Sequence, residues 1–248
     1  MQTKIDNLVK WIRSQVPEGG KAIIGISGGK DSTIAAALCV RALGAENIVG
    51  VMMPHGVQKD IEDSYEVCRH LGIYSIEINI EEMYHSLTEK IADEFRCFTF
   101  PSLFTTNTPA RLRMTTLYAV AAMYENSRVV NTCNRSEDYV GYSTKYGDAA
   151  GDFSPLGNLT VREILEIGDE LGLPEHLVHK APSDGMCGKT DEDNLGFTYE
   201  QLDNHILNTG EVDMDTRIKI ERLHKATRHK YTPMPMFDPK EVMGNGLD

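Results

Sequence analysis

The most chemically informative pattern in this sequence is a run of eight residues between a β-branched segment and an Ala/Leu-rich segment. In order, these are Gly25, Ile26, Ser27, Gly28, Gly29, Lys30, Asp31 and Ser32. Consecutive glycines adopt backbone conformations that other residues avoid, and they keep side chains out of the turn. Backbone N–H groups and the start of the following helix can then face an anion. The run therefore predicts a loop that binds phosphate groups.

Asp31 requires a separate explanation, because a carboxylate repels phosphate. Beside a phosphate site, a carboxylate is typical of a Mg²⁺ ligand, either directly or through water. Ser27 and Ser32 add hydroxyl donors to the same loop. The loop thus has the residue types that a magnesium–nucleotide complex needs.

Two common nucleotide-binding patterns do not match this loop. No Lys-Ser or Lys-Thr pair follows the second glycine as in G-x-x-x-x-G-K-[ST], and the spacing is not G-x-G-x-x-G. A plain strand-to-helix turn with Asp31 or Ser32 as the helix cap is the structural alternative. We favour phosphate binding because the complete run lies between a predicted strand and a predicted helix.

Alternating strands and helices must position this loop. We expect strands at Lys21–Ile26, Asn47–Met53, Tyr74–Ile80 and Arg128–Thr132. Apolar spacing predicts helices at Ile5–Val16, Ser32–Leu43, Asp60–Leu71, Glu81–Phe98, Arg111–Glu125, Thr160–Leu171, Tyr199–Leu207 and Asp213–His229. We expect Thr99–Pro109 to be irregular and Asn134–Pro155 to form loops and a short helix. This alternation predicts an α/β fold with a parallel sheet, and the absence of linkers or repeats predicts one domain over residues 1–248.

Composition narrows the functional classes. The net charge of −12 argues against broad attraction to nucleic acid, although a local basic pocket is compatible with it. The five cysteines form no C-x-x-C pair, which argues against a disulfide framework or a zinc ribbon. No apolar run reaches the length of a membrane span, and the N-terminus lacks a secretory pattern. We therefore expect a cytoplasmic protein without membrane partners.

The glycine-rich run resembles the pyrophosphate loop, S-G-G-x-D-S, of the N-type ATP pyrophosphatases. The resemblance implies a Rossmann-like parallel sheet flanked by helices, of the adenine nucleotide alpha hydrolase-like type. It also implies cleavage of ATP between its α and β phosphates, with adenylation of an acceptor and release of pyrophosphate. The loop alone does not identify the acceptor.

Further segments, in the same order along the chain, resemble the short, ammonia-dependent NAD synthetases. These segments are Met53–Asp60, Pro109–Met114, Asn131–Glu137, Thr144–Asp148, Lys180–Ser183 and Arg228–Lys230. The resemblance implies that deamido-NAD (nicotinic acid adenine dinucleotide) is amidated by ammonia through an acyl-adenylate. ATP is the implied co-substrate, Mg²⁺ the implied cofactor and a homodimer the implied assembly.

The resemblance also implies roles for the matched residues. ATP would be held by Gly25–Ser32 together with Thr132 and Ser183. Asp31 and Glu137 would be the Mg²⁺ ligands, and Asp31 would also be catalytic. Residues implied for binding deamido-NAD are Arg111, Lys145, Asp152, His229 and Lys230. Because ammonia is mostly ammonium at neutral pH, a carboxylate could attract it and take its proton, and our candidate is Asp148.

Two departures from the family pattern affect individual sites. Cys133 and Asn134 replace the usual Asp-His pair, and Val161 stands where many members have a lysine that contacts ATP. Lys180 or Lys189 could compensate for that lysine. Taken singly, the site residues also have structural explanations: Glu137 could cap a helix or pair with Arg135, and surface arginines are usually solvated.

Two other functions stay open at this point. The chain could be another N-type ATP pyrophosphatase that adenylates a different carboxylate. It could also be a nucleotide-binding module without turnover, which the departures at Cys133–Asn134 and Val161 would suit. The presence of both Asp31 and Glu137 favours an enzyme.

Overall fold

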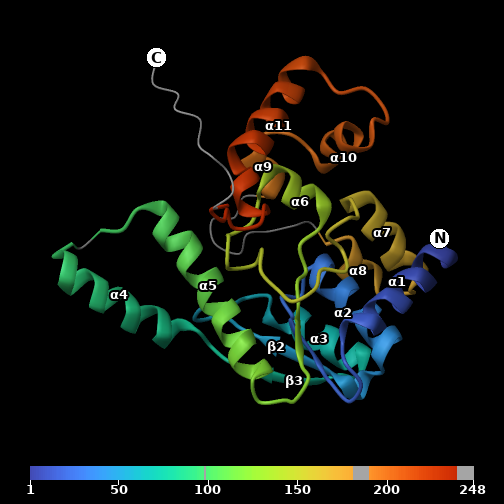
Figure 1. The fold of residues 1–248 in the computed structure, drawn as a ribbon, viewed down its shortest axis with the longest axis horizontal. Helices are drawn as coiled ribbons and strands as arrows, with labels where there is room; N and C mark the ends of the chain where they lie inside the picture. Colours follow the sequence, from blue (N-terminus) through green and yellow to red (C-terminus); the bar gives the residue numbers. More distant parts are fainter. Residues whose placement is uncertain (98, 181–189, 239–248) are drawn as a thin grey trace.

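A four-stranded parallel sheet forms the centre of the protein, seen in a computed structural model that describes residues 1–97, 99–180 and 190–238 (Figure 1). The strands are β1 (Ala22–Gly25), β2 (Ile48–Met52), β3 (Tyr74–Glu77) and β4 (Arg128–Val130). Their order across the sheet is β3-β2-β1-β4, and every neighbouring pair is parallel. The predicted α/β fold with a parallel sheet is confirmed.

Both faces of the sheet are covered by helices. The helices are α1 (Gln2–Gln15), α2 (Lys30–Leu43), α3 (Ile61–Leu71), α4 (Glu81–Phe95), α5 (Ser102–Ala121), α6 (Arg135–Val140), α7 (Val161–Glu170), α8 (Glu175–Val178), α9 (Asp191–Leu195), α10 (Tyr199–Leu207) and α11 (Met214–Thr227). Short 3-10 turns lie at Ala45–Asn47 and Arg228–Lys230. Within the described ranges, none of the helices combines the length and the apolar character that a membrane crossing requires.

Successive residues of a strand point to opposite faces, and this alternation produces two cores. Ile24 of β1 is buried in a core with helices α1, α2 and α7, whereas Ile23 is buried in a second core with α5. Each core removes a large apolar area from water, which is the main driving force for this layered arrangement. A third, smaller core joins α6, α7, α10 and α11 beyond the sheet, where Leu202 and Ile220 are fully buried.

Helix α5 differs from the sequence prediction. The segment Thr99–Pro109 was expected to be irregular, but α5 begins at Ser102 and contains Pro109 in its interior. Proline removes one backbone hydrogen bond from a helix and usually interrupts it. Here Pro109 is buried and Thr105 Oγ1 donates to Ser102 O at 2.9 Å. The segment is therefore helical despite Pro109, and the prediction for this segment is wrong.

The loop between β1 and α2 packs closely against α3. Gly28 has φ +74°, a left-handed conformation that favours glycine. A Cβ atom at Gly28 would lie 2.8 Å from Asp63 Cβ and 3.0 Å from Ser64 N. Backbone conformation and space therefore both require glycine at this position.

We predict that Gly28→Ala destabilises the fold more than Gly72→Ala. Gly72 has φ +62° at the end of α3, and a Cβ there would meet no atom within 4 Å. Gly72→Ala should cost about 1 kcal/mol from backbone strain alone. Gly28→Ala should cost about 1–3 kcal/mol more from overpacking against α3. Urea denaturation of the two variants measures the difference, and equal costs would contradict the packing argument.

A second prediction concerns the ion pair that joins α1 to α7, in which Lys4 Nζ lies 2.8 Å from Glu163 Oε1. Burial alone would raise the pKa of Glu163, but hydrogen bonds from Lys4 and Thr160 outweigh burial and lower it. A lowered folded-state pKa means stability that is present above the unfolded pKa of about 4.3 and lost as the pH falls through the folded value.

Glu163→Gln preserves the hydrogen-bonding shape of the side chain and removes its charge. The variant should lose about 0.5 kcal/mol of unfolding free energy at pH 7 and progressively less as the pH falls below the unfolded pKa, as measured by urea denaturation across that range. Lys4→Met should give a similar loss at pH 7, and the double variant should add little to either. A loss that is independent of pH would show that the ion pair is not its cause.

Candidate active site

The parallel pairing of β1 with β4 places two loops side by side. Ala22, Ile23 and Ile24 pair with Arg128, Val129 and Val130, so both strands point in the same direction. The glycine-rich loop follows β1, and the segment leading to α6 follows β4. In open α/β sheets, ligands bind outside the carboxyl ends of the strands, where the chain connections diverge to opposite sides. In this sheet that point lies between β1 and β4.

Hydrogen bonds within the glycine-rich loop hold it in shape. Ser27 N donates to Ser32 Oγ at 3.2 Å, the two serine hydroxyls lie 3.0 Å apart, and Gly29 N donates to Ser27 Oγ at 3.2 Å. Helix α2 begins at Lys30 with Gly29 as its N-cap and has no side-chain capping bond. The alternative in which Asp31 or Ser32 caps this helix is therefore wrong. The uncapped N-terminus is suited to an anion.

The structure brings the two predicted metal ligands to one place, through Asn134. The Asn134 side chain donates from Nδ2 to Asp31 Oδ1 at 2.9 Å and accepts from Glu137 N at 3.0 Å. Glu137 Oε2 accepts in return from Asn134 N at 3.2 Å, which completes a capping box at the start of α6. The expected cap by Glu137 is thus present, and it holds the Glu137 carboxylate beside Asp31.

Lys30 adds a positive charge to this pair of carboxylates. Its side chain is only 6% exposed, and Nζ lies 2.8 Å from Asp31 Oδ2. Burial, with the charge of Asp31 second, raises the pKa of Glu137 well above its ordinary value. For Lys30, burial alone would lower the pKa, but Asp31 and Glu137 outweigh it and raise the pKa. The lysine is therefore a cation that neutralises the carboxylate pair.

These residues fit a magnesium ion that arrives with a nucleotide. Among residues 1–97, 99–180 and 190–238, no group of three or more His, Cys, Asp or Glu side chains could hold a metal ion by itself. Mg²⁺ is usually bound by one or two carboxylates together with water and substrate phosphates. Asp31 at the start of α2 and Glu137 at the start of α6 match that arrangement better than a site made of protein ligands alone.

Four of the five predicted substrate-binding residues lie together near the end of α11. Arg111 Nε donates to Lys145 O at 3.2 Å, and Lys145 Nζ donates to His229 O at 2.7 Å. Lys230 Nζ lies 2.7 Å from both Gly141 O and Ser143 O. Segments far apart in the sequence therefore form one basic surface on an acidic protein.

Asp152, the fifth of these residues, is held by β4 and α5. Its Oδ2 accepts from Val129 N at 2.7 Å, and its Oδ1 accepts from Tyr118 OH at 3.1 Å. Tyr118 and Arg111 both belong to α5, so one helix connects Asp152 to the basic surface. Asp152 therefore joins β4 to α5 through both of its carboxylate oxygens.

Asp148 lies beside the segment that follows β4, and the charge of Lys230 acts on its carboxylate. Asn131 Nδ2 and Cys133 Sγ both donate to Asp148 O, at 2.7 and 3.2 Å, and Thr144 N donates to Asp148 Oδ1 at 3.0 Å. Burial raises the pKa of Asp148, although hydrogen bonds from Thr144 oppose it. A carboxylate with a raised pKa is a stronger base than an exposed one, which suits proton transfer.

A cavity of about 390 Å³ opens beside Lys30 and is lined in part by Val161, Lys180 and Tyr199. Lys180, proposed as a substitute for the lysine missing at position 161, instead binds Asp60 and Asp63 at 2.9 and 2.6 Å. Thr132 lies in the segment between β4 and α6. Ser183 and Lys189 fall outside the described residues.

The sequence reading missed three residues of this site. Asn134 was noted only as a departure, although its spacing to Glu137 is that of a capping box. Asp191 and Tyr199 approach from the C-terminal helices: Tyr199 OH donates to Asp191 Oδ2 at 3.2 Å, and Lys30 Nζ lies 5.5 Å from the Tyr199 ring centroid. No local pattern connects them to the glycine-rich loop, because the contact is tertiary.

Comparisons with known proteins show the family of this chain. The family model described as NAD synthase matches residues 4–234. An NH(3)-dependent NAD(+) synthetase from Carboxydothermus hydrogenoformans is 37% identical over 233 residues, which cover 92% of this chain and 94% of that protein.

Solved structures are similar over nearly the whole chain. An NMN synthetase from Francisella tularensis has a TM-score of 0.87 at 32% identity and covers 96% of this chain and 98% of that one. An NH3-dependent NAD synthetase from Campylobacter jejuni, in complex with nitrate, has a TM-score of 0.76 at 27% identity, covering 96% and 99%. This chain, with its adjoining loops after β1 and β4, therefore belongs to the NAD synthase family.

Proposed function

We propose that this protein amidates deamido-NAD with ammonia, using ATP and releasing AMP and pyrophosphate. The observation that carries the proposal is the hydrogen-bonded unit of Asp31, Asn134 and Glu137 at the start of α2. Membership of the NAD synthase family supports the same reaction. We further propose that residues 1–248 act as one functional domain.

In this proposal the glycine-rich loop binds the phosphates of ATP. The N–H groups at the start of α2 would face the ATP phosphates, and the helix dipole would favour the negative charge of these phosphates. Asp31 and Glu137 would hold Mg²⁺, which supplies charge stabilisation for the departing pyrophosphate. Oriented phosphates leave the α-phosphate open to attack by the substrate carboxylate.

The basic surface would bind the acidic substrate. Deamido-NAD carries a pyrophosphate and a pyridine carboxylate, and Arg and Lys bind such groups strongly. Arg111, Lys145, His229 and Lys230 are the proposed contacts, and Asp152 positions the elements that carry them. The carboxylate oxygen attacks the α-phosphate of ATP, which forms the acyl-adenylate and releases pyrophosphate.

Asp148 is proposed to receive the proton that ammonium must lose. Ammonia then attacks the acyl carbon of the adenylate, and AMP leaves as the amide forms. Cys133 and Asn131, which precede the start of α6, bind the Asp148 backbone, and the charge of Lys230 acts on its carboxylate. This position is where the two substrates would meet.

The similarity to an NMN synthetase structure favours a second candidate acceptor. The NMN synthetase structure covers this chain at a TM-score of 0.87, against 0.76 for the Campylobacter synthetase. The corresponding acceptor here would be nicotinic acid mononucleotide, which has the same pyridine carboxylate and lacks the adenylate half. The chemistry at Asp31, Glu137 and Asp148 is identical for both acceptors.

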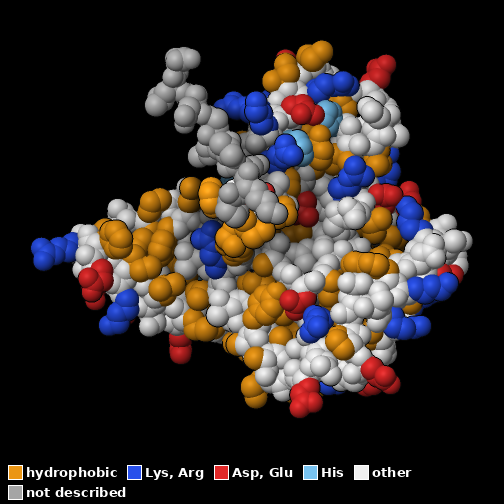
Figure 2. All heavy atoms as spheres, in the orientation of Figure 1, with side chains coloured by type: hydrophobic (Ala, Val, Ile, Leu, Met, Phe, Trp, Pro, Cys, Tyr) orange, Lys and Arg blue, Asp and Glu red, His pale blue; other side chains and the backbone are white. Residues whose placement is uncertain are grey.

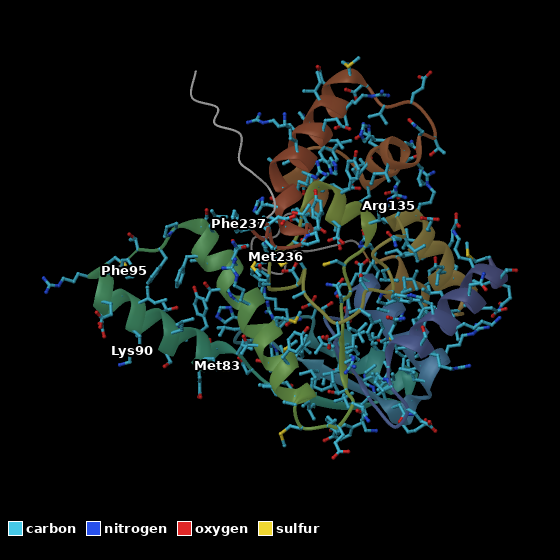
Figure 3. All side chains as sticks on the ribbon, in the orientation of Figure 1. Met83, Lys90, Phe95, Arg135, Met236 and Phe237 are labelled. Carbon is cyan, nitrogen blue, oxygen red and sulfur yellow. The ribbon has the colours of Figure 1, made fainter. Side chains whose placement is uncertain are left out.

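We also propose a homodimer formed through α4 and α5. These helices extend from the sheet, and apolar side chains gather along them (Figures 1 and 2). Phe95 and Leu103 are 77% and 73% exposed, and α4 buries none of its residues. Figure 3 shows Met83, Lys90 and Phe95 along α4, with Phe95 at its outer end. Exposed apolar surface of this kind is typical of a protein–protein interface.

The reaction is tested with purified protein, ATP, Mg²⁺ and ammonium, with deamido-NAD and nicotinic acid mononucleotide supplied separately and then in competition. We expect equal amounts of amide, AMP and pyrophosphate by mass spectrometry. Asp31→Asn and Glu137→Gln should each lower kcat by about 10²-fold or more, because charge stabilisation in the transition state is lost. A control, Asp213→Asn, removes a carboxylate from the distant N-cap of α11 and should leave kcat unchanged.

The two acceptors are compared by their kcat/KM values. A higher value for deamido-NAD supports the primary proposal, and a higher value for the mononucleotide replaces it with the second acceptor. If neither acceptor yields AMP and pyrophosphate, the proposed amidation is refuted. ATP binding without turnover would then indicate a nucleotide-binding module.

The dimer is tested by light scattering after size exclusion. The wild type should have about twice the chain mass of 27.7 kDa. Phe95→Asp combined with Leu103→Asp should give monomers, because each charge would be buried without a partner. Ile218→Asp is the control, since Ile218 is 58% exposed on α11, away from α4. A monomeric wild type at tens of micromolar would refute the proposal.

A further inference from the structure

The buried ammonium of Lys30 occupies the place of a cation in the carboxylate site. Asp31 binds it directly at 2.8 Å, and the charges of Glu137 and Asp191 also act on it. The Tyr199 ring lies on another side of it, with the centroid 5.5 Å from Nζ. A lysine this deeply buried needs charged partners, because burying an unpaired ammonium is very costly. Here the carboxylates supply them.

Both oxygens of Asp31 already accept hydrogen bonds from protein groups. Lys30 Nζ binds Oδ2 and Asn134 Nδ2 binds Oδ1, at 2.8 and 2.9 Å. A metal ion on Oδ2 would therefore lie directly beside the Lys30 ammonium, which binds the same oxygen. Two cations side by side also repel each other, and this repulsion is strong away from bulk water. In this arrangement Lys30 and a divalent cation compete for the same carboxylate.

The structure offers the displaced lysine both space and a new partner. The cavity of about 390 Å³ is lined by Lys30 itself, so the side chain borders open volume. A lysine ammonium is a common ligand of phosphate oxygens. Lys30 is also the first residue of α2, where the phosphates of a bound nucleotide would lie. Leaving Asp31 therefore does not require Lys30 to lose its ionic partner.

We propose that Lys30 is an internal counter-ion that exchanges with Mg²⁺ when nucleotide binds. Without nucleotide, Lys30 neutralises Asp31 and Glu137 and keeps divalent cations out. With nucleotide, Lys30 transfers its hydrogen bond to a phosphate oxygen, and the metal takes its place on Asp31. Metal binding thus becomes conditional on nucleotide. The inference rests on the proposed ATP site but not on the identity of the acceptor.

The test measures Mn²⁺ binding to the full chain without nucleotide, by electron paramagnetic resonance of free Mn²⁺. Lys30→Met should bind Mn²⁺ at least about tenfold more tightly than wild type, because the competing charge is absent. Lys30→Met combined with Asp31→Asn should lose that gain. Lys21→Met is the charge-matched control, because it also removes one positive charge. Lys21 lies at the other end of β1, where its Nζ donates to Glu46 O.

Thermal melting must first show that the variants fold. If Lys30→Met does not fold, Lys30→Gln replaces it, since its amide can still donate to Asp31 without a charge. Equal Mn²⁺ affinities of wild type and a folded Lys30 variant would overturn the proposal, and so would an equal gain in Lys21→Met.

A second measurement examines the other half of the exchange. ATP binding in EDTA, by calorimetry, should weaken at least about tenfold in Lys30→Met, because the phosphates lose their lysine partner. Unchanged affinity would overturn the transfer of Lys30 to phosphate. Failure of the amidation assay alongside the expected Mn²⁺ and ATP results would refute the proposed acceptor and leave the exchange intact.

Discussion

The parallel pairing of β1 with β4 is the constraint on which the rest of the site depends. It directs the glycine-rich loop and the segment before α6 to the same edge of the sheet. Asp31 and Glu137 are far apart in sequence, yet their carboxylates approach because each follows one of these strands. An antiparallel pair would put the two loops at opposite ends, and no carboxylate site could form.

Asn134 converts this proximity into a defined geometry. A capping box normally satisfies backbone groups at a helix start. Here the same asparagine also donates to Asp31, so the cap of α6 is bonded to the first turn of α2. The hydrogen bonds of Asn134 thus stabilise the short helix α6 and also orient the Asp31 carboxylate. The Asp-His pair of the family pattern is replaced without loss of a polar connection between the two loops.

Charge in this acidic protein is balanced locally. Lys30 is surrounded by carboxylates at the loop, while Lys145 and Lys230 donate to backbone carbonyls near α11. These bonds hold the two lysines in place and leave their charges intact, because a backbone carbonyl is neutral. A basic surface for an anionic substrate is therefore compatible with a net charge of −12.

Sequence alone predicted the fold class correctly, and it also predicted a phosphate-binding loop, because both predictions depend on local patterns. Apolar runs alternating with helical spacing predicted the parallel sheet, and the glycine-rich run predicted a turn in which Gly28 adopts a positive φ. The ordered segments also predicted the family. The prediction from local preference was wrong at α5, where Pro109 and the residues before it are helical, and only the part of that helix after Pro109 packs in the core beside the sheet.

Only the tertiary structure decided which charges share a site. The approach of Asn134, Asp191 and Tyr199 to the glycine-rich loop could not be predicted from the sequence. Those contacts join the β1 loop to α6, α9 and α10, which lie more than a hundred positions later in the chain. Side-chain distances across such separations are set by how strands pair and helices pack, and neither has a local signature.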